Sequence, residues 1–206
     1  WLLNKSIVIG ITGPTGSGKS TIAKMIEQMG YELLDVDCIA KSVIQDSASC
    51  INDLKNEFSS NVINEDGSIN RAELFDRAFS SKDSLKRLNE IVHPEIVKKL
   101  EGLIDNIKMS GKNVVVDAAV LFESGADKLC DFTISVLAPK RTRTYRVIYR
   151  DGISRTVANK RINAQQKDSF YKENADYILD GSKNVLSLYS DIKKIILNHT
   201  PDLNEN

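Results

Sequence analysis

A glycine-rich segment near the amino terminus has the residue types and spacing that bind phosphate groups. Residues 13–20 read Gly-Pro-Thr-Gly-Ser-Gly-Lys-Ser, which fits the pattern of a glycine, four free positions and Gly-Lys-Ser/Thr. In such a loop, backbone N–H groups and the positive end of the following helix hold phosphate oxygens. Lys19 reaches the β- and γ-phosphates, and the Ser20 hydroxyl ligates Mg²⁺. The sequence therefore predicts a nucleoside triphosphate site; the alternative is a strand–helix turn that binds nothing.

Two aspartates provide the carboxylates that phosphoryl transfer could use. Asp35 and Asp37 end the apolar segment 31–37, which is predicted to be the second strand. Residues two apart on a strand point to one face of the sheet, and strand ends border the ligand crevice in such folds. A carboxylate there could accept a proton from an attacking hydroxyl or help to hold Mg²⁺. For each aspartate the alternative is a cap on a helix that starts at Ile39.

A basic segment follows Pro139 and could form a lid over the phosphates. Arg143, Arg146 and Arg150 have helical spacing and would share one side of a helix. Ser154 can cap a second basic helix, and two such helices suit a lid that closes over a triphosphate and excludes water. We expect one or two of these arginines to contact phosphate and the other basic residues to be solvated.

The order of apolar segments predicts an α/β fold with a parallel sheet and helices on both faces. The predicted strands are residues 7–11, 31–37, 113–117, 132–137 and 177–179. Between the second and third strands all residues look helical, and Pro94 fits the first turn of a long helix. We interpret this insertion as a substrate-covering subdomain, with a purely structural insertion as the alternative. His93, beside Pro94, could be a helix cap or a ligand-binding residue.

These boundaries divide one P-loop unit, residues 1–206, into three parts. The core comprises about residues 1–40, 111–138 and 175–198, the helical subdomain about 41–110, and the lid about 139–172. The final helix is expected to bury one face that consists of Val185, Leu188, Ile192, Ile195 and Ile196.

Composition excludes several classes of partner. Lys+Arg and Asp+Glu number 28 each, so no overall field favours nucleic acid or acidic membranes. Three cysteines without a Cys-x-x-Cys pair argue against a disulfide framework or structural zinc and favour reduced thiols in the cytoplasm. No apolar run approaches the length of a membrane span, and no signal peptide precedes the first strand. Trp1 in place of an initiator Met suggests that the true start is missing or replaced.

Five segments in order resemble the dephospho-coenzyme A kinase family, which catalyses the last step of coenzyme A synthesis. They cover nearly the whole chain and are residues 10–13 (Gly-Ile-Thr-Gly), 35–40 (Asp-Val-Asp-Cys-Ile-Ala), 66–71 (Asp-Gly-Ser-Ile-Asn-Arg), 88–94 (Leu-Asn-Glu-Ile-Val-His-Pro) and 121–123 (Leu-Phe-Glu). The resemblance implies a kinase that moves the γ-phosphoryl of ATP, with Mg²⁺, to the ribose 3′-hydroxyl of dephospho-coenzyme A. It also implies a small-molecule substrate and a monomer or small homo-oligomer.

The resemblance assigns roles to particular residues. It implies Asp37 as the base, Lys19 and Arg150 as catalytic contacts to the phosphates, and Ser20 as the metal ligand. His93, Leu121 and Phe122, with Asp37, would contact the acceptor. The expected nucleotide contacts are Gly13, Pro14, Thr15, Gly16, Ser17, Gly18, Lys19, Ser20, Thr21 and Arg146.

The chain departs from the family pattern at four places. Pro14-Thr15 replaces Gly-Ile at free positions of the loop, and Ala119-Val120 replaces Pro-Leu near the acceptor pocket. Arg143 stands where the family often has Gln. Gly181 takes a position that is commonly Asn, which affects an expected contact on the adenine side.

Two other functions fit the motifs without the resemblance. One is a kinase of another small metabolite, such as a nucleoside monophosphate. The other is a binding module whose nucleotide state controls a partner. A guanine-reading Asn-Lys-x-Asp motif is absent from the sequence, which disfavours a GTPase. The residues do not decide whether Asp35 or Asp117 supports Mg²⁺.

Overall fold

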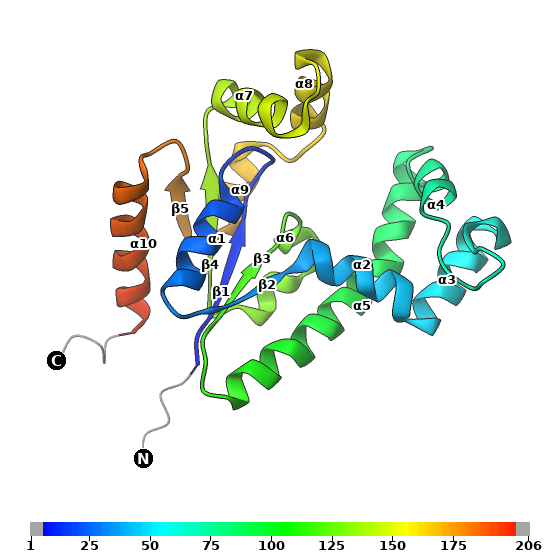
Figure 1. Ribbon diagram of the computed structural model, residues 1–206, viewed down its shortest axis with the longest axis horizontal. Helices are drawn as coiled ribbons and strands as arrows, with labels where there is room; N and C mark the ends of the chain where they lie inside the picture. The colour runs from blue at the N-terminus through cyan, green and yellow to red at the C-terminus, as the bar shows by residue number, and fades with distance from the viewer. Residues whose placement is uncertain (1–5, 201–206) are drawn as a thin grey trace.

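A five-stranded parallel sheet forms the centre of the computed structural model, which describes residues 6–200 (Figure 1). Its strand order is β2-β3-β1-β4-β5. The strands are β1 (Val8–Thr12), β2 (Glu32–Asp35), β3 (Val114–Asp117), β4 (Phe132–Leu137) and β5 (Tyr177–Asp180). All five lie within the predicted segments or one residue beyond them. The α/β fold with a parallel sheet is therefore confirmed.

The carboxyl ends of the strands meet at one edge of the sheet. Asp117 of β3 is the register partner of both Asp35 on β2 and Ile11 on β1, while Thr12 is the partner of Ser135 on β4. Residues 13–18 leave the sheet at this edge and lead into helix α1 (Lys19–Gln28). The phosphate-binding motif thus lies where parallel α/β sheets bind their ligands.

Helices bury both faces of the sheet. On one face, α1 and α10 (Val185–His199) contribute Ile22, Ile26 and Ile192 to a core with alternate residues of β1 and β4. The other face packs against the helical insertion. Of the five residues expected on the buried face of α10, Leu188, Ile192, Ile195 and Ile196 are buried, but Val185 is 63% exposed.

The insertion between β2 and β3 extends away from the sheet (Figure 1). Its elements are α2 (Val36–Asp46), α3 (Ala48–Phe58), the 3₁₀ helix η1 (Ser60–Val62), α4 (Arg71–Ala78) and α5 (Lys82–Met109). Asn70 caps α4 by accepting a hydrogen bond of 3.2 Å from the Glu73 backbone N–H. A single antiparallel bridge between Ile63 and Ile69 interrupts the helices.

The prediction that Pro94 lies in a first helical turn was wrong. Helix α5 begins at Lys82, where the Ser81 hydroxyl accepts a hydrogen bond of 3.0 Å from the Ser84 backbone N–H. Pro94 lies inside this helix and costs about 3 kcal/mol, because it has no N–H to donate. Buried side chains such as Val92 and Ile96, each worth about 1.5–3 kcal/mol, keep the helix continuous.

The predicted second strand was too long at its carboxyl end. Strand β2 stops at Asp35, whose Oδ1 accepts a hydrogen bond of 3.1 Å from the Cys38 backbone N–H and so caps α2. The helix starts at Val36, earlier than the expected Ile39. Asp37 therefore lies in the first helical turn, and the two aspartates do not share one face of a strand. The capping alternative is confirmed for Asp35.

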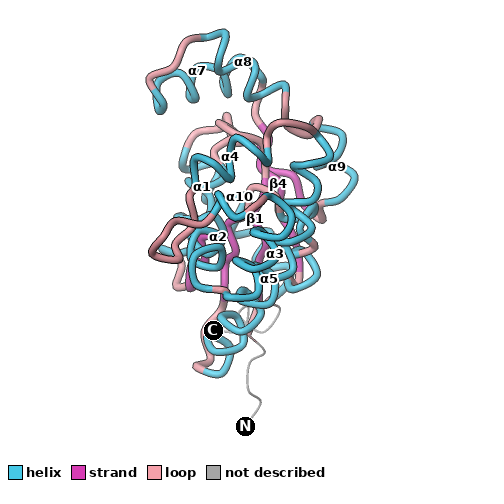
Figure 2. The backbone as a smooth tube through the Cα atoms, turned by 90° about the vertical axis from the view of Figure 1, so that its right-hand side faces the viewer, coloured by secondary structure: helices cyan, strands magenta, loops and turns pink. Residues whose placement is uncertain are grey.

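The segment after β4 forms three short helices, of which the first two lie beyond the carboxyl edge of the sheet and the third lies beside β4 (Figures 1 and 2). They are α7 (Lys140–Asp151), α8 (Arg155–Asn163) and α9 (Asp168–Asn174). Ser154 caps α8 by accepting a hydrogen bond of 3.3 Å from the Val157 N–H, as predicted. Between β3 and β4 lie α6 (Leu121–Ser124) and the 3₁₀ helix η2 (Ala126–Leu129). Within residues 6–200, none of the helices has the length and apolar character to cross a membrane.

Candidate active site

The loop between β1 and α1 has a backbone path that needs glycine. Gly16 and Gly18 have φ values of 76° and 104°, in the left-handed region that side chains disfavour. A Cβ at Gly16 would lie 2.7 Å from the Arg143 carbonyl oxygen. The glycines therefore allow both the sharp turns of the loop and its close contact with α7.

Backbone amides of this loop are free to bind an anion. In the described part of the chain, the N–H groups of Gly16, Gly18, Lys19 and Ser20 have no hydrogen-bond partner. Consecutive free amides at a helix N-terminus form a concave site for phosphate oxygens. The Ser17 N–H instead donates to the Pro14 carbonyl at 3.1 Å, which closes the turn.

Lys19 is held at the sheet edge by an ion pair. Its Nζ contacts the Asp117 carboxylate at the end of β3, and the two side chains are only 14% and 8% exposed. A triphosphate in the loop would compete with Asp117 for this ammonium group. The pair keeps both charges compensated at a site where either one alone would be costly to bury.

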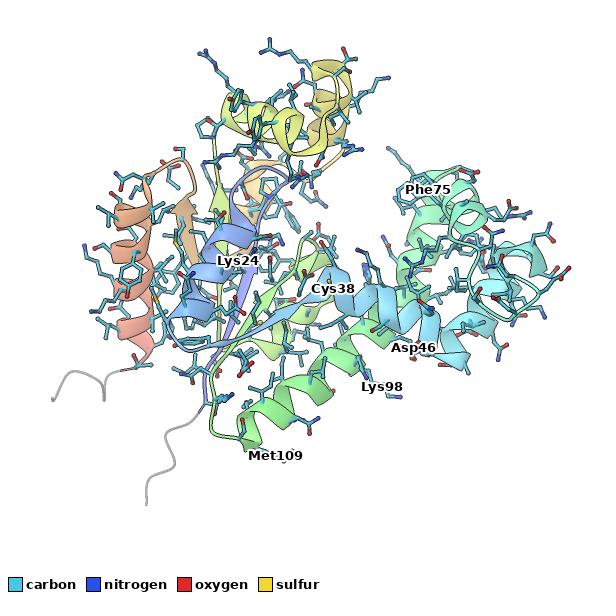
Figure 3. All side chains as sticks on the ribbon, in the orientation of Figure 1. Lys24, Cys38, Asp46, Phe75, Lys98 and Met109 are labelled. Carbon is cyan, nitrogen blue, oxygen red and sulfur yellow. The ribbon has the colours of Figure 1, made fainter. Side chains whose placement is uncertain are left out.

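A pocket of about 590 Å³ joins the loop to residues of the insertion and of helix α7. All eight motif residues line it, together with Thr21 from α1 and Asp37 from α2. Figure 3 shows Cys38, the residue after Asp37, at the amino-terminal end of α2 beside the sheet. Arg146 and Arg150 of α7 complete the part of the pocket that the sequence predicted. The structure thus brings a carboxylate and the phosphate-binding loop to one pocket.

The two arginines of α7 have different surroundings. Arg150 is largely exposed; its Nε donates to Asp151 Oδ1 at 2.7 Å, and its Nη2 lies 3.4 Å from Thr15 Oγ1. The hydrogen bond to Asp151 raises the pKa of the Arg150 guanidinium, so it stays charged. Arg146 instead donates to three backbone carbonyl oxygens. Arg150 has the freer side chain for contact with phosphate.

Apart from Asp37, the predicted acceptor residues lie outside this pocket. His93 lines a groove of about 970 Å³ between α5 and the segment that contains α6. Burial lowers the pKa of His93, an effect that a hydrogen bond to the Glu123 backbone partly opposes. Phe122 makes an edge-to-face contact with Phe170 of α9, with ring centroids 6.0 Å apart. Leu121 is fully buried and therefore supports this region from beneath.

Comparison with known proteins decides the family. The family model for dephospho-CoA kinase matches residues 7–187. The chain belongs to the dephospho-CoA kinase family. The dephospho-CoA kinase of Fusobacterium nucleatum subsp. nucleatum is 31% identical over 188 residues, covering 91% of this chain and 96% of that protein. The dephospho-CoA kinase of Corynebacterium diphtheriae is 34% identical over 182 residues, covering 87% and 91%.

Solved structures support the fold of the kinase. A protein from Thermus thermophilus has a TM-score of 0.79 and 30% identity, with 95% of this chain and 98% of that chain covered. A dephospho-CoA kinase from Campylobacter jejuni has a TM-score of 0.68 at 23% identity, with 95% and 98% covered. A shikimate kinase from Bacteroides thetaiotaomicron shares the fold at a TM-score of 0.56 and 14% identity, with 92% and 98% covered.

The donor set of the kinase fits a magnesium ion that is shared with the nucleotide. Among residues 6–200, no cluster of three His, Cys, Asp or Glu side chains could hold a metal alone. Mg²⁺ prefers oxygen ligands and usually retains waters and binds substrate phosphates beside one or two protein groups. The Ser20 hydroxyl, which lines the pocket beside the loop, is a ligand of this kind.

Gln165 is a site residue that the sequence analysis missed. It follows α8, and its Oε1 accepts a hydrogen bond of 2.8 Å from the Thr15 backbone N–H. Lys183 and Leu188, near the start of α10, also line the phosphate pocket. These three residues could not be predicted because they lie far from the motif in the sequence. The only signal for Gln165 was its place within the predicted lid, residues 139–172.

Gly181 meets the loop more closely than a side chain allows. A Cβ at this position would lie 2.0 Å from the Ser17 carbonyl oxygen and 2.8 Å from Val136 Cγ1. The Gly181 N–H donates to the Leu137 carbonyl at 2.8 Å, which fixes the segment after β5. Glycine at position 181, in place of the commoner Asn, therefore allows the backbone to pack closely against the loop.

We expect Gly181→Ala to displace the phosphate-binding loop. The overlap should cost about 1–3 kcal/mol of unfolding free energy, and misplaced loop amides should lower turnover about 100-fold. Urea unfolding and steady-state kinetics measure both. Gly102→Ala is the control, because nothing lies within 4 Å of its Cβ position and alanine favours a helix. Wild-type turnover in Gly181→Ala would contradict the close-packing argument.

We expect His93 to contribute to acid sensitivity. Its pKa is lower in the folded protein than the ordinary value of 6.5, so the unfolded chain binds the proton more readily and stability falls below that pH. The His93→Gln variant lacks this loss. Urea unfolding at about pH 7.5 and about pH 5.5 should show that the free energy of unfolding falls less in the variant than in the wild type on going to the lower pH. A constant difference between the two proteins would rule out this contribution.

Proposed function

We propose that this kinase transfers the γ-phosphoryl group of ATP to the ribose 3′-hydroxyl of dephospho-CoA, giving ADP and CoA in the last step of CoA synthesis. The main observation behind this proposal is that the free amides of the loop, Lys19 and Asp37 line one pocket. Phosphoryl transfer needs mainly positioning and charge stabilisation, and this pocket supplies both. Membership of the dephospho-CoA kinase family supports the choice of acceptor.

The loop and Lys19 bind the donor. The backbone amides of Gly16, Gly18 and Ser20 donate hydrogen bonds to the phosphate oxygens. The positive N-terminal end of α1 attracts the same anion. Lys19 moves from Asp117 to the β- and γ-phosphates, and Arg150 adds charge from α7. Ser20 would hold Mg²⁺, which would neutralise negative charge on the phosphates when it is bound.

Asp37 acts on the acceptor. Its exposed carboxylate in the first turn of α2 accepts the proton of the 3′-hydroxyl. As the bond from O3′ to the γ-phosphorus forms, the bond from that phosphorus to the β,γ-bridging oxygen breaks, and ADP leaves with its electron pair. Lys19 and Arg150 stabilise the charge on the transferred group.

The helical insertion binds the acceptor, and the helices after β4 cover the donor. We propose residues 41–110 as the acceptor subdomain, with His93 in its groove and Phe122 at the contact between α6 and α9. Residues 139–172 act as the lid, which excludes water from the transfer.

We further propose a cytoplasmic monomer or small homo-oligomer that has no nucleic-acid partner. Cys38, Cys50 and Cys130 are free, which suits a reducing compartment. The balanced charge of the whole chain favours no nucleic acid.

An acceptor screen tests the proposal. Purified protein with Mg²⁺ and ATP is offered dephospho-CoA, a nucleoside monophosphate or no acceptor, and ADP release is followed. We expect release that depends on dephospho-CoA. Release with the monophosphate alone would indicate another small-metabolite kinase, and slow hydrolysis without any acceptor would indicate a nucleotide-dependent switch.

A further inference from the structure

We propose that Arg146 is a positioning residue that shapes the phosphate-binding loop through its carbonyl oxygens, in place of the direct nucleotide contact that the family resemblance implies. Its Nη1 donates to the carbonyl oxygens of Gly16 at 3.2 Å and Ser17 at 3.0 Å. Its Nη2 donates to the Gly181 carbonyl oxygen at 2.9 Å. One guanidinium group thus joins α7, the loop and the segment after β5.

The planarity of the peptide bond links these contacts to the phosphate site. In a trans peptide the C=O and the following N–H point in opposite directions. Because the Ser17 carbonyl points to Arg146, the Gly18 N–H in the same peptide points away from it, and this amide is among those free to bind an anion. The carbonyl of Gly16 belongs to the peptide whose N–H closes the turn on Pro14. Arg146 therefore fixes two successive peptide planes.

An arginine suits this task better than a lysine. The guanidinium is a planar fork with five donors in fixed directions, whereas an ammonium is a point charge on a flexible stem. Hydrogen bonds from a charged donor are roughly twice as strong as neutral ones. Gly181, which lacks a Cβ, lets the third carbonyl reach the same fork next to Ser17.

Amide spectra of the nucleotide-free protein test the proposal. We expect Arg146→Met to shift the ¹H–¹⁵N resonances of Gly16 and Gly18 before any ligand is added. Because the loop holds the phosphates common to both nucleotides, the Kd values for ADP and ATP should rise by one factor, about 10- to 100-fold. Arg150→Met is the matched control: it should leave the free-state resonances of Gly16 and Gly18 in place and weaken ATP binding more than ADP binding.

Arg146→Lys keeps the positive charge but loses the guanidinium geometry, so it separates a positioning role from an effect of charge alone. It is also the variant to use if Arg146→Met does not fold. A positioning role predicts the same free-state shifts and little rescue, because lysine cannot form the fork. Unchanged Gly16 and Gly18 resonances, full rescue by lysine, or a loss specific to ATP would overturn the proposal. Only the effect of Arg146 on turnover rests on the proposed function. These readouts need no acceptor, so they remain decisive even if the acceptor screen fails.

Discussion

Lys19→Ala is expected to lower turnover by about 10²- to 10³-fold, because the transferred phosphoryl group loses a preorganised cation. The substitution also leaves the Asp117 carboxylate, which is nearly buried, without its ion-pair partner. An unpaired buried charge is destabilising, so stability should fall as well. Steady-state ADP release and urea unfolding measure the two effects separately.

A double variant separates the loss of catalysis from the loss of stability. In Lys19→Ala with Asp117→Asn the buried carboxylate is gone, so we expect stability to recover while turnover stays low. Lys24→Ala on the exposed side of α1 (Figure 3) is the matched control and should keep wild-type turnover. Recovery of turnover in the double variant would show that Lys19 matters only for its ion pair.

Asp37→Asn is expected to lower turnover by about 10²- to 10⁴-fold, the range attributed to general acid–base catalysis. An amide of the same shape accepts no proton from the acceptor hydroxyl. Because Asp37 is exposed and the free amides belong to the loop, the Kd for ATP should change little. Turnover is measured with dephospho-CoA as acceptor, and ATP binding by calorimetry.

Asp35→Asn is the matched control for this prediction. Asn caps helices nearly as well as Asp does, so the cap on α2 should persist and turnover should stay near the wild-type value. If Asp37→Asn turned over normally, or if Asp35→Asn lost as much turnover as Asp37→Asn, the assignment of Asp37 as the base would be wrong.

Local sequence patterns predicted the central strands, because a strand that is buried on both faces has an apolar sequence along its whole length. The runs of Val and Ile at β1, β3 and β4 are buried throughout, as central parallel strands require. Element ends were less predictable. Asp35 could end a strand or cap a helix, and its hydrogen bond to the Cys38 N–H favours the cap. Pro94 suited a helix start, yet burial along α5 carried the helix through it.

Most members of the candidate pocket could be predicted, but the contacts between residues far apart in sequence could not. The loop at residues 13–20 carries its own geometry in its glycines. By contrast, Lys19 and Asp117 meet across 98 positions, and Thr15 and Gln165 across 150. Such contacts depend on the order of strands in the sheet and on how the chain returns after α8. The carbonyl contacts of Arg146 likewise give no signal in the sequence, where the residue looked like a nucleotide contact.

Phosphorus-31 NMR of the reaction of purified protein with magnesium-ATP and dephospho-CoA identifies the hydroxyl group that receives the phosphoryl group. We expect ADP and one new phosphomonoester to appear in equal amounts, with the new phosphorus coupled to the ribose 3′ proton. Formation of ADP and inorganic phosphate alone, or a phosphomonoester at any other hydroxyl, would contradict this expectation.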